Sequence, residues 1–202
     1  LPHLAHSGDR GRFRSRLRGS TVAVMSRADT RRIIGEAELI SGLFSNQWQL
    51  VQHGEVLANA IRRPRNAYTR VTLKDGTRWT LQPDGWGVVR AVEDDVPFAR
   101  ATRDSFWGNR WEISGVGYTY RLVHDGRIPR RWALEVGSEP AAWLRGSVVN
   151  YNRVRFNAPI SIPISAGLLA WHVVARPWEA VAFAPELLTA DGRRAAAAEP
   201  LS

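Results

Sequence analysis

The chain has 202 residues, a formal net charge of +9, nine tryptophans and no cysteine. This length suits one domain or two small ones, and it is enough to bury a core without covalent crosslinks. The lack of cysteine excludes disulfides and thiolate metal sites and leaves the redox compartment open. The many tryptophans favour a core or a ligand site built from large aromatic side chains.

Positive charge is concentrated at the N-terminus. Residues 1–32 hold eight arginines against two aspartates, which is +6 of the total +9 and leaves +3 for the remaining 170 residues. A folded part so nearly balanced does not predict a nucleic-acid-binding surface. We expect residues 1–32 to be a disordered basic tail, and residues 1–24 to be an upstream extension, because Met25 is the only methionine.

From residue 37 to residue 156 the chain alternates short apolar and polar runs separated by turn signals. In "VTLKDGTRWTL", Trp79 and Leu81 alternate with polar residues, and Asp75-Gly76 predicts a type I′ turn with positive φ at both positions. One face of each strand is then buried and the other wet, as in antiparallel sheets. Further turn signals are His53-Gly54, Pro83-Asp84-Gly85, Ser114 to Gly117, Asp125-Gly126 and Gly137 to Pro140. About a dozen strands at this spacing indicate a sandwich or a barrel.

The sharpest acidic run, Glu93-Asp94-Asp95, could bind a cation, but a solvated turn between two strands is the preferred interpretation. The tripeptide pattern Trp-x-Leu/Ile recurs along the chain, too irregularly for a propeller or a solenoid. Its four copies begin at Trp48, Trp79, Trp111 and Trp132.

An uncharged stretch runs from Ala158 to Ala175. A membrane-spanning helix needs about 20 mostly apolar residues, but Pro159 and Pro163 interrupt the start of this one. A helix near residues 162–175, with Ser161 as a possible cap, would be about 21 Å long, which is shorter than the ~30 Å hydrocarbon core. We therefore expect a helix enclosed by strands. A C-terminal transmembrane helix is the alternative.

Motifs for catalysis, metals and nucleotides were not found, so no catalytic residue, metal or cofactor is predicted. His172, alone on the apolar helix, is interpreted as a core residue. Two basic clusters remain, and they could form an anion or lipid site if their loops meet at one barrel end. They comprise Arg62, Arg63 and Arg65 in the first and Arg130 and Arg131 in the second. Ordinary surface charge is the competing interpretation.

Four segments resemble the tubby C-terminal-like superfamily, most closely its LURP-one-related branch, over about residues 35–178. They are "NQWQLVQHGEVLANAIR", "LKDGTRWTL", "GYTYRLV" and "APISIPISAGLLAWHVVARPW". The resemblance implies a twelve-stranded antiparallel barrel closed around a hydrophobic C-terminal helix. It implies lipid binding rather than catalysis, but the tubby lipid-site motif is not recognisable, so phosphoinositide specificity is not carried over.

The sequence thus predicts a single antiparallel barrel over residues 33–188, with a central helix near 162–175 and a disordered tail over 189–202. The predicted function is a non-enzymatic binding module for a lipid headgroup or a protein partner. The protein is expected in the cytoplasm, and peripheral at the membrane if its ligand is a lipid. The alternatives are a membrane-anchored protein and a small-molecule enzyme using the barrel mouth.

Overall fold

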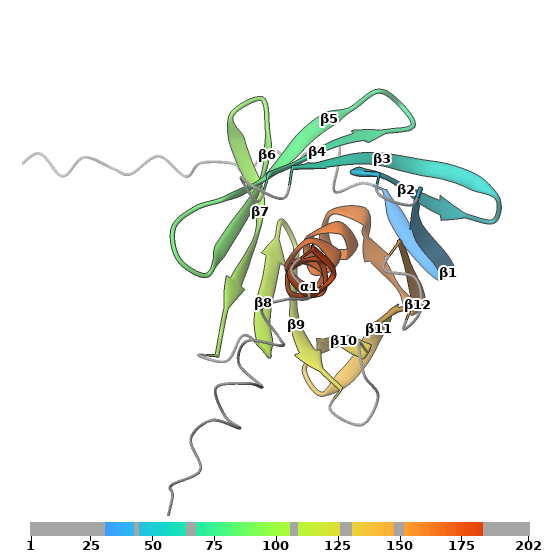
Figure 1. Cartoon of the computed structure of the whole chain (residues 1–202). Coiled ribbons are helices and arrows are strands. Elements are labelled where there is room, and N and C mark those ends of the chain that lie inside the picture. Colours follow the sequence, from blue (N-terminus) through green and yellow to red (C-terminus); the bar gives the residue numbers. More distant parts are fainter. Residues whose placement is uncertain are drawn as a thin grey trace, which may run out of the picture.

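The computed structural model describes residues 31–42, 45–63, 68–105, 109–125, 131–147 and 152–183, with side chains in the last range described as far as residue 175. In these described residues, twelve strands surround one C-terminal helix (Figure 1), which confirms the predicted fold class. The strands are β1 (Arg32–Ser41), β2 (Gln47–Gln52), β3 (Glu55–Arg63), β4 (Tyr68–Leu73), β5 (Arg78–Pro83), β6 (Val88–Glu93), β7 (Val96–Arg103), β8 (Arg110–Gly115), β9 (Tyr118–His124), β10 (Arg131–Val136), β11 (Glu139–Gly146) and β12 (Arg153–Pro163), and the helix is α1 (Ile164–Phe183).

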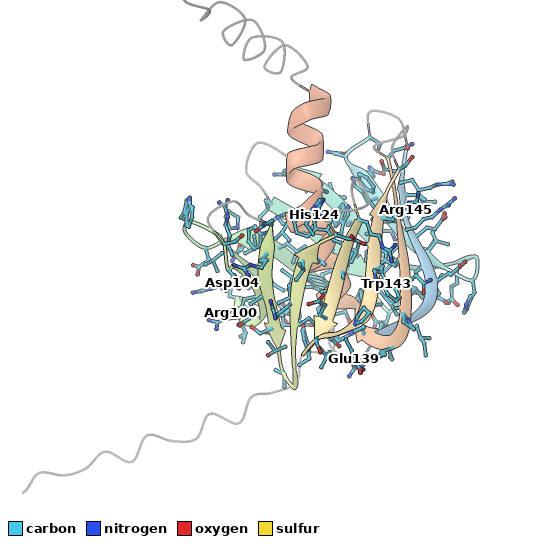
Figure 2. All side chains as sticks on the ribbon, turned by 90° about the horizontal axis from the view of Figure 1, so that it is seen from below. Arg100, Asp104, His124, Glu139, Trp143 and Arg145 are labelled. Carbon is cyan, nitrogen blue, oxygen red and sulfur yellow. The ribbon has the colours of Figure 1, made fainter. Side chains whose placement is uncertain are left out.

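Strands that follow one another in the chain pair antiparallel, and β12 also pairs with β1, so the sheet closes into a barrel. Odd-numbered strands therefore run one way and even-numbered strands the other. We call the end where odd-numbered strands finish, such as Ser41 of β1 and Gly146 of β11, the upper end, as it lies in Figure 2. α1 starts after β12 at the lower end and runs toward the upper end.

The predicted alternation decides which side chains fill the barrel. In β5, Trp79 and Leu81 are buried while Arg78 is exposed. Trp48 and Trp132 are likewise buried, and the closed ring leaves no unpaired strand edge among the described strands. Three of the four copies of the Trp-x-Leu/Ile pattern thus place their tryptophan in the core, and Trp111 is partly buried against it.

The turn at Asp75-Gly76 differs from the predicted type I′. Only Gly76 has a positive φ, of 86°, and its N–H donates to the carbonyl of Leu73. The Asp75 carboxylate instead accepts a 2.9 Å hydrogen bond from the Thr77 N–H, a local alternative that aspartate side chains offer in turns. Positive φ at two successive positions occurs in the turn at Asp94 and Asp95, where the acidic run joins β6 to β7 as expected.

α1 also departs from its predicted bounds. Ile162 still pairs with Ile33 in the barrel wall, so Ser161 belongs to β12 and does not cap the helix. The N–H of Ile164 is satisfied by the carbonyl of Arg31 at 3.0 Å. At the other end the helix continues past Pro177 to Phe183, beyond the predicted end at residue 175.

Every residue of α1 from 164 to 175 is buried, which explains why this helix is apolar on all sides. It lies inside the ring of strands (Figure 1), and its Trp171 ring lies 5.2 Å from that of Trp48 on β2. On another side, Ser165 is hydrogen-bonded to Tyr118 of β9 at 2.9 Å. In the part of the chain that is described, no helix is both long and apolar enough to cross a bilayer.

Candidate anion-binding site

The structure describes three of the five arginines in the two predicted clusters. Arg62 is only 2% exposed, with its guanidinium carbon 5.4 Å above the Trp171 ring. Arg63 ends β3 and is exposed, and Arg131 begins β10. Both lie at the upper end, but β3 and β10 are five strands apart by the shorter way round the ring. Arg65 and Arg130 lie outside the described residues.

Arg62 belongs to a polar cluster inside the barrel. Thr69 is next to it across the β3–β4 pair, and the Thr69 Oγ1 lies 3.0 Å from the Nδ1 of His172. His172 is thus a hydrogen-bonded core residue. The buried polar and charged side chains of the described chain are these three and Ser165, and no carboxylate is among them.

A different set of arginines is brought together on the outer wall. In register, Arg131 of β10 faces Arg145 of β11, and Arg145 faces Arg155 of β12. We call these three residues the arginine row. Directly opposite residues have Cβ atoms about 4.5–5.5 Å apart, and like charges so placed repel each other. The row therefore favours an anion that would neutralise it.

The two ends of the arginine row are partly neutralised, and its centre is not. Asp125 lies 3.5 Å from Arg131, and Glu38 lies 3.0 Å from Arg155. Arg145 is exposed, and among the described residues it has no ion pair or hydrogen-bond partner. The same Glu38 also lies 3.7 Å from a fourth arginine, Arg153. The local positive charge thus exceeds what these two carboxylates can neutralise.

A groove of about 550 Å³ runs beside the arginine row. Its lining includes Trp143, whose ring lies 5.5 Å from the Arg131 guanidinium carbon, and the carboxylates of Glu36 and Glu38 at its far side. Figure 2 labels Trp143 and Arg145 on the same wall of the barrel. The volume is within the range of about 300–1,000 Å³ typical of ligand sites. Arginine presents paired donors that fit phosphate and carboxylate oxygens.

Sequence reasoning found Arg131 but missed Arg145 and Arg155. A signal was present, because each lies between buried residues and so must point outward from its strand. What the sequence does not show is the register that sets these outward positions side by side. For Arg62 the signal was clearer, since it has the same parity as the buried Ala58 and Ala60.

No cluster of His, Asp or Glu side chains among the described residues is arranged to hold a metal ion. Membership of the tubby-like superfamily remains a prediction from the sequence. Comparisons of the chain with protein-family models, curated proteins and solved structures gave no match.

Proposed function

We propose that this protein is a non-enzymatic binding module whose wall at β10, β11 and β12 takes a phosphate-bearing ligand, with the headgroup of an anionic lipid as the first candidate. The observation that carries the proposal is the position of Arg145. It is exposed, it has no partner among the described residues, and Arg131 and Arg155 flank it on the neighbouring strands. Guanidinium groups in such a row match the oxygens of a phosphate with charge-assisted hydrogen bonds.

The expected binding is weak and reversible. Each basic residue near an anionic surface contributes about 1 kcal/mol, and the attraction decays within a Debye length of ~8 Å at physiological salt. Three arginines thus supply a few kcal/mol, which suits peripheral association rather than anchoring. Glu38 already engages Arg155, so a ligand has to compete with this carboxylate.

The test compares vesicles of phosphatidylcholine alone with vesicles of phosphatidylcholine and phosphatidylserine. The full chain should sediment with the anionic vesicles at low salt and dissociate as salt is raised. Arg145→Gln should weaken the binding without lowering the melting temperature. Arg78→Gln is the matched control, because Arg78 is also exposed but begins β5 at the lower end.

Two results would contradict the proposal. If Arg145→Gln and Arg78→Gln bind anionic vesicles equally well, the arginine row is not the site. The N-terminal arginines are then the next residues to test for vesicle binding. If the unmodified chain does not bind anionic vesicles at low salt, a lipid headgroup is excluded as the ligand. A protein partner is then the ligand class to test next.

A further inference from the structure

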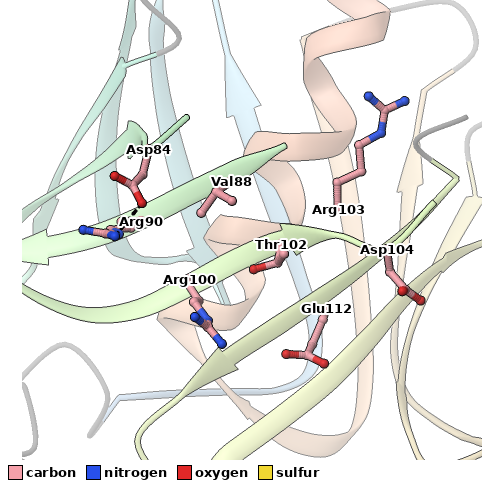
Figure 3. Close-up of a pocket in the computed structure, with 8 residues that line it drawn as sticks. All are labelled: Asp84, Val88, Arg90, Arg100, Thr102, Arg103, Asp104 and Glu112. Carbon is pink, nitrogen blue, oxygen red and sulfur yellow. Dashed lines mark ion pairs between the residues drawn. The ribbon is translucent and has the colours of Figure 1, made fainter. Parts of the chain in front are cut away.

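A second groove, of about 280 Å³, lies on the wall formed by β6, β7 and β8 (Figure 3). It is lined by charges of both signs. Arg100 and Thr102 come from β7, and Glu112 comes from β8. Asp104 follows β7 at the upper end. This groove is on a different wall from the arginine row, so a ligand bound in it would be independent of the proposed function.

The strand register places Arg100 close to Glu112 on the outer wall. Thr102 faces Glu112 directly, while Arg100 faces Ser114, so Arg100 and Glu112 are diagonal neighbours. Diagonal neighbours in an antiparallel pair are about 7–8 Å apart. Figure 3 shows Arg100 and Glu112 projecting from adjacent strands, with Thr102 above them in this view.

Other charges around the groove are already engaged. Arg90 forms an ion pair with Asp84. Arg103 has its guanidinium carbon 5.0 Å above the ring of Trp86, and in Figure 3 it points away from Arg100 and Glu112. Because Asp84, Arg90 and Arg103 have these other partners, they do not neutralise Arg100 or Glu112.

Arg100 and Glu112 do not neutralise each other. Arg100 makes one weak contact, from its Nε to the Oγ of Ser114 at 3.4 Å. Within the described chain, neither Arg100 nor Glu112 nor Asp104 takes part in an ion pair, and Arg121, which faces Glu112 from β9, forms none with it either. A cation and two carboxylates thus line one groove with their charges open to a ligand.

We propose that this groove binds a small zwitterion, with its oxyanion on the guanidinium of Arg100 and its ammonium on the carboxylate of Glu112, near Asp104. The Thr102 hydroxyl can hydrogen-bond the ligand, and Val88 offers an apolar contact for its linker. The groove volume is just below the usual range of about 300–1,000 Å³ for ligand sites, which indicates a small molecule. Because Arg100 and Glu112 are diagonal neighbours that form no ion pair with each other, the ligand charges must be separated by several bonds to reach both side chains. This describes an ω-amino acid or a short peptide rather than an α-amino acid.

The test is a titration of the full chain followed by amide NMR shifts. The probe is 6-aminohexanoate, whose methylene chain separates its two charges. Hexanoate and hexylamine are matched controls that each lack one charge, and glycine is a zwitterion too short to span the groove. We expect saturable shifts in β7 and β8 with 6-aminohexanoate, and binding about tenfold weaker for each control, since one charge-assisted interaction is lost.

Protein variants give the second arm. Arg100→Gln and Glu112→Gln should each weaken 6-aminohexanoate binding about tenfold. Arg145→Gln should leave it unchanged while weakening binding to anionic vesicles, so the two sites can fail independently. The proposal is overturned if hexanoate binds as well as 6-aminohexanoate, if Glu112→Gln has no effect, or if no probe shifts β7 and β8. A phosphoethanolamine lipid headgroup carries the same two charges. If the protein binds vesicles of phosphatidylethanolamine but not free 6-aminohexanoate, the proposal of a small free ligand is also overturned.

Discussion

Replacing Leu169 on α1 tests whether the helix is the core of the barrel. Leu169 is 0% exposed. Leu→Ala replacements at buried sites cost about 2–5 kcal/mol, more where the surroundings cannot collapse into the cavity. The wall around α1 is a closed hydrogen-bonded ring, so we expect Leu169→Ala to cost about 3–5 kcal/mol, in the upper part of that range.

Leu169→Asp should prevent folding altogether. An unpaired buried charge adds several kcal/mol to the lost packing, and the total approaches the 5–15 kcal/mol that typically stabilises a domain. Ile160→Asp is the matched control, because Ile160 on β12 is 48% exposed and its replacement leaves the charge in water.

Urea unfolding followed by tryptophan fluorescence measures these effects. Leu169→Ala should lower the midpoint by about 1–2.5 M urea, since the free energy of unfolding of a domain of this size falls by roughly 2–3 kcal/mol per molar, the upper part of the usual range. Ile160→Asp should change the midpoint little. A cooperative transition for Leu169→Asp near the wild-type midpoint would refute the enclosed position of the helix.

Three further predictions concern the tail, a turn and the arginine row. A chain beginning at Met25 should melt at the same temperature as the full chain, and a drop of several degrees in calorimetry would show that residues 1–24 contribute to the fold. The hydrogen bond from the Thr77 N–H holds the pKa of Asp75 below its usual value of about 3.9, so its stabilisation is present above that pH and lost as the pH falls through the folded pKa. Asp75→Asn should therefore lower the melting temperature at neutral pH, and the difference should shrink below pH 4; an equal difference at both pH values would contradict this. Glu38→Gln should strengthen vesicle binding because it releases Arg155, and unchanged binding would show that the ligand does not compete with this carboxylate.

Features that depend on local patterns could be predicted from the sequence. The alternation around Trp79 and the turn signals between strands define which residues point inward and where the chain reverses. The uncharged stretch from Ala158 to Ala175 predicted a buried helix, because a helix that is apolar on all sides has no face to offer water. The acidic run at Asp94 and Asp95 was predicted as a solvated turn because a run of charged residues favours water.

Features that depend on distant segments were decided by the tertiary structure. Ile162 remains in β12, rather than starting the helix, because it pairs with Ile33. Ile33 is far from it in the sequence, so no local pattern shows this pairing. Arg62 contacts the ring of Trp171, which only the position of α1 inside the barrel makes possible.

Both candidate sites depend on the same kind of information. The alternation within a strand tells that Arg100, Arg145 and Arg155 point outward, but not which residues lie beside them. Side-by-side placement follows from the register between strands, and a shift of one residue would turn each side chain to the opposite face. That register is set by the closure of the whole ring and the packing of its interior against α1, so no local stretch of sequence contains it.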